Sequence, residues 1–372
     1  MKYRFDQIAI NSTAKKVPTE ADKEHYIGLE HIDSECLDIT RWGSDVAPIG
    51  EKLIMKKGDV LFGKRRAYQR KLAIAPFDGI FSAHGMVLRP NEEVVDKDFF
   101  PFFMSSDAFM ERAVQISVGG LSPTINWKDL REQEFSLPPL AEQKALADKL
   151  WAAYRLKESY KKLLAATEEM VKSQFIEMFG TINSPNGMMS TLGELCHIQR
   201  GGSPRPIKDY ITTDANGLNW IKIGDTDDSM YIKKTEEKIK PSGLKKTRQV
   251  YAGDLLLSNS MSFGRPYILK IDGCIHDGWL VLHIKDESIL TQIYLCAYLS
   301  QQSTYVEMSK LAAGGVVQNL NSEIVKKLPV VLPPIQKQME YISILEQSDK
   351  SGFELRKSID AIDAVIKSLI NS

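Results

Sequence analysis

The chain has 372 residues, with 48 Lys and Arg against 48 Asp and Glu, so its formal net charge at pH 7 is zero. Hydrophobic residues make up 43% and charged residues 26%, a composition typical of globular proteins that excludes wholesale disorder. No apolar run approaches the roughly 18 residues that a membrane helix needs, so we expect no membrane-spanning segment. Zero net charge excludes a uniformly basic coat for nucleic acid but allows local basic patches.

Residues 1–139 are predicted to form a mixed α/β domain. They contain short β-branched and aromatic runs that end at Gly, Asp or Pro, such as KLIMKKGDVLFG and KLAIAPFDGIFS. Runs of this length bounded by turn residues predict strands. A helical piece is expected over 97–118.

Residues 140–180 are predicted to form a long helix. The Leu-Pro-Pro step at 137–139 precedes a run without Pro or Gly up to Phe179, and Pro costs little at a helix start because the first amides have no partner. Seam residues recur at alternating steps of four and three, which indicates a heptad seam. We assign a spacer or partner-docking role to seam residues Leu146, Leu150, Tyr160, Leu164 and Val171.

The second half of the chain repeats this plan. The 25 residues that begin at Gly119 and the 25 that begin at Gly314 are identical at seven positions, an offset of 195, and the same offset pairs Gly58-Asp59 with Gly253-Asp254. Such self-similarity indicates a tandem duplication. We predict a second α/β domain over 181–334, with a helical piece over 289–313, and a second long helix over 335–372. Its seam residues are Leu345, Leu355, Ile359, Ile362 and Ile366.

The predicted fold class is therefore α+β. Two similar mixed α/β domains are expected, separated by two long antiparallel coiled-coil helices in a pseudo-twofold tandem duplication. Neither helix can bury its apolar stripe against itself, and the chain returns through the second domain, which favours antiparallel pairing.

Local charge indicates what the duplicated domains bind. Eight basic residues and one acid lie between Lys52 and Lys71, and seven basic residues lie between Lys233 and Arg248. Arg, Lys, Gln and Tyr side chains hold phosphates and read base edges. Two related domains joined by a rod suit a DNA target made of two half-sites.

The candidate DNA-binding residues come from two loops in each domain. In the first domain they are Lys64, Arg65, Arg66, Tyr68, Arg70, Lys71, Ser122, Thr124 and Asn126. In the second domain they are Arg200, Ser203, Arg205, Ser258, Asn259, Arg265, Gln318 and Asn319.

The order of these landmarks resembles the specificity subunit of type I restriction-modification enzymes. The matching segments are RGGSPRPIKDY followed by LNWIKIGD, the GDVLFGKRR and GDLLLSNSMSFGRP segments, GGLSPTIN, the helix starts SLPPLAEQKALADKL and VLPPIQKQMEYISIL, and SQFIEMFG. The resemblance implies two target recognition domains that bind a bipartite double-stranded DNA sequence. It also implies two partner modification subunits, which bind S-adenosylmethionine and methylate adenine, and restriction subunits that cleave DNA.

The residues themselves predict no catalytic group, no metal site and no cofactor in this chain. No GxxxxGK[ST] loop is present, the Pro-Pro steps follow Leu rather than Asn or Asp, and the six histidines have no metal-ligand spacing. The four cysteines are far apart without any CxxC, which favours a reducing cytoplasm.

Three alternatives remain open. The chain could be a specificity subunit of another restriction system type, a coiled-coil scaffold that never touches DNA, or an enzyme that acts alone. DNA methylation or cleavage by the purified chain would establish the last, and a gel shift with the full complex would decide the second.

Overall fold

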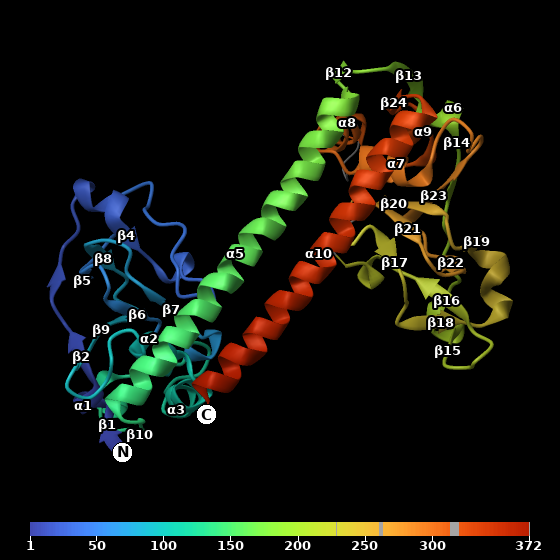
Figure 1. Ribbon diagram of the computed structural model, residues 1–372. Helices are drawn as coiled ribbons and strands as arrows, with labels where there is room; N and C mark the ends of the chain where they lie inside the picture. Colours follow the sequence, from blue (N-terminus) through green and yellow to red (C-terminus); the bar gives the residue numbers. More distant parts are fainter. Residues whose placement is uncertain (228, 260–262, 313–319, 372) are drawn as a thin grey trace. The chain divides into compact units, whose positions relative to one another are not determined.

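The computed structural model describes residues 1–227, 229–259, 263–312 and 320–371. The chain divides into two compact units. Unit 1 contains Met1–Leu163 and Glu354–Ser372, and unit 2 contains Leu164–Phe353. Each unit therefore holds one α/β domain, the beginning of one long helix and the end of the other (Figure 1). No helix in the described part of the chain is long and apolar enough to cross a membrane.

The domain of unit 1 has two four-stranded sheets, with strand orders β2-β9-β6-β7 and β3-β5-β8-β4, and the pair β1-β10. Its strands are β1 (Lys2–Arg4), β2 (Ala9–Ser12), β3 (Lys15–Lys16), β4 (Tyr26–Ile27), β5 (Lys52–Met55), β6 (Val60–Phe62), β7 (Leu72–Ile74), β8 (Gly79–Phe81), β9 (Met86–Pro90) and β10 (Glu134–Ser136). Its helices are α1 (Phe5–Ile8), α2 (Phe100–Ser105), α3 (Asp107–Gln115) and α4 (Trp127–Leu130).

The domain of unit 2 has two five-stranded sheets, ordered β14-β23-β20-β21-β17 and β15-β18-β16-β22-β19, and two strand pairs, β11-β12 and β13-β24. The strands are β11 (Gly180–Thr181), β12 (Ser184–Pro185), β13 (Met188–Thr191), β14 (Cys196–Arg200), β15 (Ile211–Thr212), β16 (Leu218–Ile221), β17 (Tyr231–Ile232), β18 (Glu237–Ile239), β19 (Arg248–Val250), β20 (Leu255–Ser258), β21 (Pro266–Leu269), β22 (Gly273–Ile275), β23 (Trp279–Ile284) and β24 (Pro329–Leu332). The helices are α6 (Leu192–Leu195), α7 (Gln292–Leu299), α8 (Gln302–Ala312) and α9 (Ser322–Lys326).

The helical pieces expected over 97–118 and 289–313 are each two helices rather than one. In unit 1 the break falls at Ser106, whose backbone is extended and whose Oγ accepts a hydrogen bond from Phe109 N, so that it caps α3. Serine side chains compete with helix continuation in this way. In unit 2 the break falls between Leu299 and Gln302.

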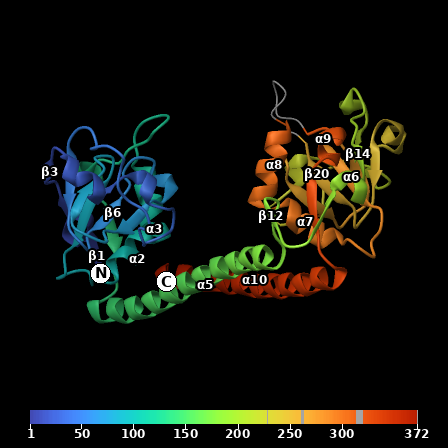
Figure 2. The ribbon, with the colours of Figure 1, turned by 90° about the horizontal axis from the view of Figure 1, so that it is seen from above.

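The two long helices are α5 (Leu140–Phe179) and α10 (Ile335–Ile370). Both begin directly after the second proline of the Pro-Pro step, and the first bonds of each helix run to the carbonyls of Pro139 and Pro334. The two helix segments of each unit lie on one side of that unit's domain (Figure 2).

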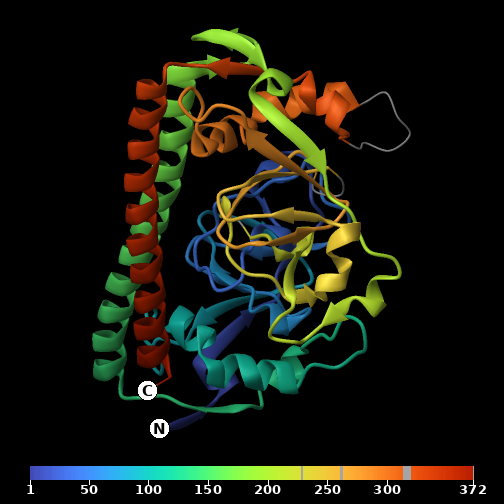
Figure 3. The same cartoon turned by 90° about the vertical axis from the view of Figure 1, so that its right-hand side faces the viewer.

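Each unit pairs the beginning of one long helix with the end of the other, which is the predicted antiparallel arrangement (Figure 3). In unit 1, Leu150 of α5 belongs to the same hydrophobic core as Ile366 of α10, and Lys157 Nζ lies 2.6 Å from Asp363 Oδ1. In unit 2, Phe175 of α5 lies edge-on against Tyr341 of α10 with ring centroids 5.1 Å apart. All predicted seam residues of both helices are buried or half-buried, whereas most positions between them are exposed.

A buried glutamine anchors each long helix to the preceding domain. Gln143 Oε1 accepts a hydrogen bond from Asp96 N, and Gln143 Nε2 donates to the carbonyls of Val94 and Pro138. Both glutamines, Gln143 and Gln338, are almost fully buried. The Pro-Pro-x-x-x-Gln motif thus combines a helix start with a three-point attachment.

Candidate nucleic-acid interface

The basic loop of the first domain follows β6 and is closed at its base by a hydrogen bond from Gly63 N to Lys71 O. Between these residues the chain makes a short 3₁₀ turn over Ala67–Gln69. Arg66 and Arg70 flank the turn, and both have left-handed backbone conformations, with φ of 59° and 50°. Because side chains other than Gly seldom adopt this conformation, the surrounding contacts must hold the loop in place.

The second predicted loop, GGLSPTIN, lies directly against the basic loop. Arg66 N donates to Pro123 O at 2.7 Å, Ile125 N donates to Lys64 O at 2.9 Å, and Arg66 Nε donates to Ser122 Oγ at 3.2 Å. An isolated β-bridge joins Arg65 to Thr124. The structure therefore brings Lys64, Arg65, Arg66, Ser122 and Thr124 together from segments about 60 residues apart in the chain.

Within this surface, Arg65, Arg66 and Tyr68 are exposed, and Tyr68 is 54% accessible. Two guanidinium groups beside an aromatic ring can hold phosphates and stack on bases. Lys64 is half-buried, and its burial together with the charge of Lys15 lowers the pKa of the Lys64 ammonium group. We call Arg65, Arg66 and Tyr68 the basic tip.

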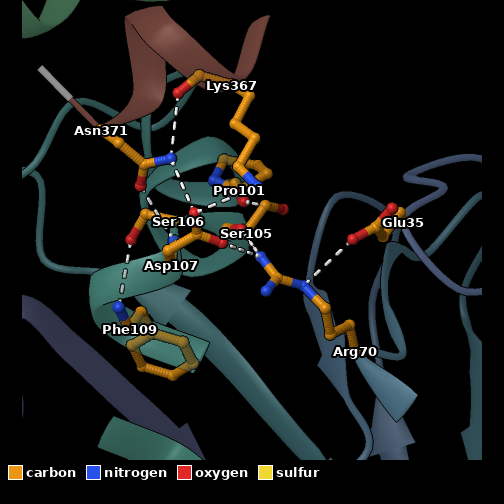
Figure 4. A network of polar contacts seen from close by, with 9 residues as sticks. All are labelled: Glu35, Arg70, Pro101, Ser105, Ser106, Asp107, Phe109, Lys367 and Asn371. Carbon is orange, nitrogen blue, oxygen red and sulfur yellow. Dashed lines mark hydrogen bonds and ion pairs between the residues drawn. The ribbon is translucent and has the colours of Figure 1, made fainter. Parts of the chain in front are cut away.

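Arg70 and Lys71 do not point outward with the basic tip. Arg70 Nη2 donates to Ser105 O and to Asp107 Oδ1, each at 2.9 Å, and Arg70 Nε lies 3.2 Å from Glu35 Oε1 (Figure 4). Lys71 Nζ donates to Leu29 O at 2.6 Å. The prediction of DNA contacts by these two side chains conflicts with this geometry, because both are already bonded within the domain.

Two further residues of the first domain qualify the prediction. Asn126 occupies the N-cap position of α4 and donates from Nδ2 to Asp129, so it is exposed but has a local role. Leu121, which was not predicted, is 97% exposed in the loop that contains Ser122. Residue type predicts that a leucine is buried, so its exposure was not expected. The one feature of the sequence that could have indicated exposure is its position after Gly119 and Gly120.

Three predicted residues of the second domain converge on Asp277, two on its carboxylate and one on its main-chain carbonyl. Ser203 Oγ donates to Asp277 Oδ1 at 2.6 Å, Arg200 Nε donates to Asp277 O at 3.0 Å, and Arg205 Nη2 lies 3.6 Å from Asp277 Oδ2. The hydrogen bond from Ser203 contributes most to the lowered pKa of Asp277, and His276 and Arg205 lower it further against burial. Arg200 and Arg205 are both exposed, so each keeps a face toward solvent.

Ser258 and Asn259 are fully buried, which contradicts their predicted role as contacts to bases. Ser258 Oγ accepts from Arg265 N, and Asn259 Nδ2 donates to Asp277 O. Both side chains are therefore bonded within the domain. Arg265 is exposed beside them and remains a candidate, whereas Gln318 and Asn319 lie outside the described residues.

The main-chain bond from Ile125 to Lys64 in the first domain recurs at the equivalent residues of the second domain. Leu320 N donates to Asn259 O at 3.2 Å, and these residues stand 195 positions after Ile125 and Lys64. The duplication therefore extends to this contact between the described residues that precede one segment and follow the other. In the described ranges, no three His, Cys, Asp or Glu side chains gather in a way that could hold a metal ion.

A duplicated α/β domain with a long helix after each copy defines a protein of two related domains on a helical spacer. The model of one family, described as the type I restriction modification DNA specificity domain, matches residues 43–168 and 186–362. The chain belongs to this family.

Curated relatives agree with this assignment. The chain is 23% identical over 368 residues to the putative type I restriction enzyme MjaX specificity subunit of Methanocaldococcus jannaschii, a match that covers 92% of this chain and 84% of that one. It is 21% identical over 354 residues to the StySPI specificity subunit of Salmonella potsdam, covering 90% and 75%. It is 29% identical over 142 residues to the EcoDI specificity subunit of Escherichia coli, covering 38% of this chain and 31% of that protein.

Solved structures share the fold. A chain from a study of complex assembly and conformational transition of the type I restriction-modification system matches with a TM-score of 0.63 and 20% identity, over 100% of this chain and 96% of that one. The type I system S subunit from M. genitalium matches with a TM-score of 0.60 and 13% identity, over 100% and 94%.

Proposed function

We propose that this chain is the DNA-recognition subunit of a type I restriction-modification complex and that each α/β domain reads one half of a bipartite target. The observation that carries the proposal is the main-chain bond that recurs between equivalent residues of the two domains, Ile125 to Lys64 and Leu320 to Asn259. In the first domain the loops joined by this bond present Arg65, Arg66 and Tyr68 to solvent. Exposed guanidinium groups on a fixed loop supply phosphate binding, and the neighbouring side chains supply base contacts.

The proposed chemistry belongs to partner proteins. Two modification subunits would carry S-adenosylmethionine and methylate adenine, and restriction subunits would cleave DNA, while this chain supplies recognition without a catalytic group or cofactor of its own. Leu156 and Leu163 support partner docking, because they lie seven residues apart on α5 and are 46% and 52% exposed. Apolar residues at this spacing share one helix face.

The proposed location is the cytoplasm. All four cysteines are free thiols, and three of them are buried. Free thiols persist in a reducing compartment.

The test of DNA recognition uses the full chain assembled with its modification subunits. Binding to duplex DNA is measured as a function of salt for the wild type and for the double variant Arg65→Gln/Arg66→Gln. If both guanidinium groups contact phosphates, the slope of log affinity against log salt should become shallower by about two. Arg131→Gln is the control, because Arg131 lies in the same domain but contacts Glu132 instead of the basic tip.

The same experiment separates the alternatives. An unchanged salt slope in the double variant removes the basic tip from the interface. Absence of DNA binding by the complete wild-type complex favours a scaffold that never touches DNA. Methylation or cleavage by the chain alone identifies an enzyme that needs no partner.

A further inference from the structure

The side chain of Asp107 is the centre of a network that connects three parts of unit 1 (Figure 4). Asp107 is the first residue of α3, directly after its cap Ser106. Its Oδ1 accepts from Arg70 Nη2 at 2.9 Å, and its Oδ2 accepts from Asn371 Nδ2 at 3.2 Å. The network therefore joins the basic loop to the C-terminal end of the chain.

The last turn of α10 holds Asp107 from the other side. Asp107 N donates to Asn371 Oδ1 at 3.0 Å, so Asn371 binds both the main chain and the side chain of this residue. Lys367 Nζ lies 3.6 Å from Asp107 Oδ2. We call Asp107, Lys367 and Asn371 the C-terminal clasp.

Arg70 connects the clasp to the basic tip, because it binds Asp107 and also ends the turn that follows Arg66. Arg70 N donates to Ala67 O and ends the 3₁₀ turn that begins after Arg66, so the two arginines stand on either side of a single turn. Arg66 in turn bonds Pro123 and Ser122. Both arginines have left-handed backbones, a conformation that persists only where contacts enforce it.

Among the residues that the structure describes, the second copy of the domain has no equivalent of the clasp. At the offset of 195, Gln302 stands where the first copy has Asp107, and Arg265 stands where it has Arg70. Lys172 and Ile176 of α5 take the places of Lys367 and Asn371, and Ile176 is 48% exposed. No side-chain hydrogen bond or ion pair joins Arg265 to another residue of the described ranges, whereas Arg70 has three partners.

We propose that the C-terminal clasp positions the first domain's DNA-contacting loop, with Arg70 and Asp107 as positioning residues rather than DNA contacts. The two equivalent arginines of the duplication then have different tasks, since Arg70 holds a loop and Arg265 faces solvent. The end of α10 thereby acts on the conformation of the basic tip. The effect of the clasp on recognition rests on the proposed function. The coupling between the clasp and the basic loop does not depend on that function.

The coupling is tested by hydrogen exchange in the full chain without DNA. Asn371→Ala removes two hydrogen bonds to Asp107 from a residue outside the α/β domain, and Ser368→Ala alters an exposed position of the same helix turn as a control. The amides of Gly63, Arg66 and Arg70 should exchange about tenfold faster in Asn371→Ala, because one lost hydrogen bond to a charged group shifts a local opening equilibrium by about this factor. Wild-type exchange at these amides would overturn the proposal.

Two further variants guard against a general loss of structure. Lys367→Met weakens the clasp from its exposed side, and Gln302→Ala changes the equivalent position of the second copy. Exchange in β6 and β9 reports on the sheet and should stay at the wild-type rate in every variant. Faster exchange confined to the basic loop supports the coupling, whereas equal acceleration in the sheet contradicts it.

The consequence for recognition is measured by sequencing modified adenines in DNA exposed to the complete complex. Clasp variants should relax the base requirement in one half of the target and leave the other half unchanged. Unchanged stringency, or equal loss in both halves, would overturn the proposed role in recognition. If the wild-type complex modifies no DNA, the proposed function fails, and hydrogen exchange alone then decides the coupling.

Discussion

Gln143 and Gln338, which stand 195 residues apart, make the same three main-chain hydrogen bonds. Gln338 Oε1 accepts from Thr291 N, and Gln338 Nε2 donates to the carbonyls of Ile289 and Pro333. Each of these groups lies 195 positions after its counterpart around Gln143. A side chain that is buried and makes three equivalent hydrogen bonds in both copies belongs to the architecture rather than to the surface.

Replacing either anchor should destabilise the unit that contains it. Gln143→Ala and Gln338→Ala each leave three main-chain groups without a partner, and we expect each variant to lose about 3 kcal/mol of unfolding free energy. Urea denaturation followed by circular dichroism measures the change. Gln347→Ala, at an exposed position of α10, should stay within about 0.5 kcal/mol of the wild type.

Tyr154 of α5 makes a second attachment in unit 1. Its hydroxyl accepts from Leu37 N at 3.0 Å and from Asp38 N at 3.2 Å, and burial raises the pKa of the phenol. Tyr154→Phe should lower the free energy of unfolding by about 1–3 kcal/mol, because both amides lose their acceptor. Tyr160→Phe, at a half-buried position further along the helix, is the matched control. Equal effects of the two substitutions would contradict the assigned role.

The four thiols should differ in reactivity. Burial raises the pKa of Cys196 and Cys296 to about 12 and that of Cys274 to about 11, whereas Cys36 is only half-buried. Since the thiolate is the reactive form, a thiol reagent at pH 8 should label Cys36 first in the native chain. Mass spectrometry of the labelled peptides identifies the sites. Rapid labelling of any of the three buried thiols before denaturant is added would show that the cores open readily.

Acid should release the C-terminal clasp. Burial opposes ionisation of Asp107, but the hydrogen bond and charge of Arg70, with the charge of Lys367, outweigh it and lower the pKa of Asp107 below its ordinary 3.8. A carboxylate with a lowered folded-state pKa contributes stability above pH 3.8, and this stability is lost as the pH falls through the folded-state pKa. The stability difference between wild type and Asp107→Asn should therefore be constant near neutral pH and shrink below about pH 4.

Urea titrations of both proteins between pH 3 and 7 measure this difference. Asp148→Asn, at an exposed position of α5, is the control variant. A difference that stays constant down to pH 3 would show that the charge of Asp107 is not what holds the clasp.

The duplication and the long helices were predictable because their signals are local. Pro139 and Pro334 mark helix starts through backbone chemistry alone, and the seam residues follow helix periodicity. The break at Ser106 was missed, since a serine inside an apolar run signals a cap only when the chain leaves the helix there.

The candidate interface was predictable only in part. Residue type predicted Arg70 as well as Arg65 to bind DNA, but the sequence does not show that Arg70 faces Asp107, a residue 37 positions away. The prediction for Ser258 was wrong for a similar reason. The sequence does not distinguish a buried serine hydroxyl that bonds the main chain from one that faces solvent. Contacts between residues separated in the chain decide both cases, and residue type alone does not reveal them.

The glutamine anchors bind almost entirely to main-chain groups. Within the described part of the chain, only the Thr291 hydroxyl adds a side-chain partner, to Gln338, while every other partner is a main-chain amide or carbonyl. Genes that exchanged one recognition module for a foreign one would keep this attachment intact, provided the exchanged segment preserved its backbone course. New combinations of half-sites could then arise by recombination in a single step, without waiting for compensating substitutions at the junction.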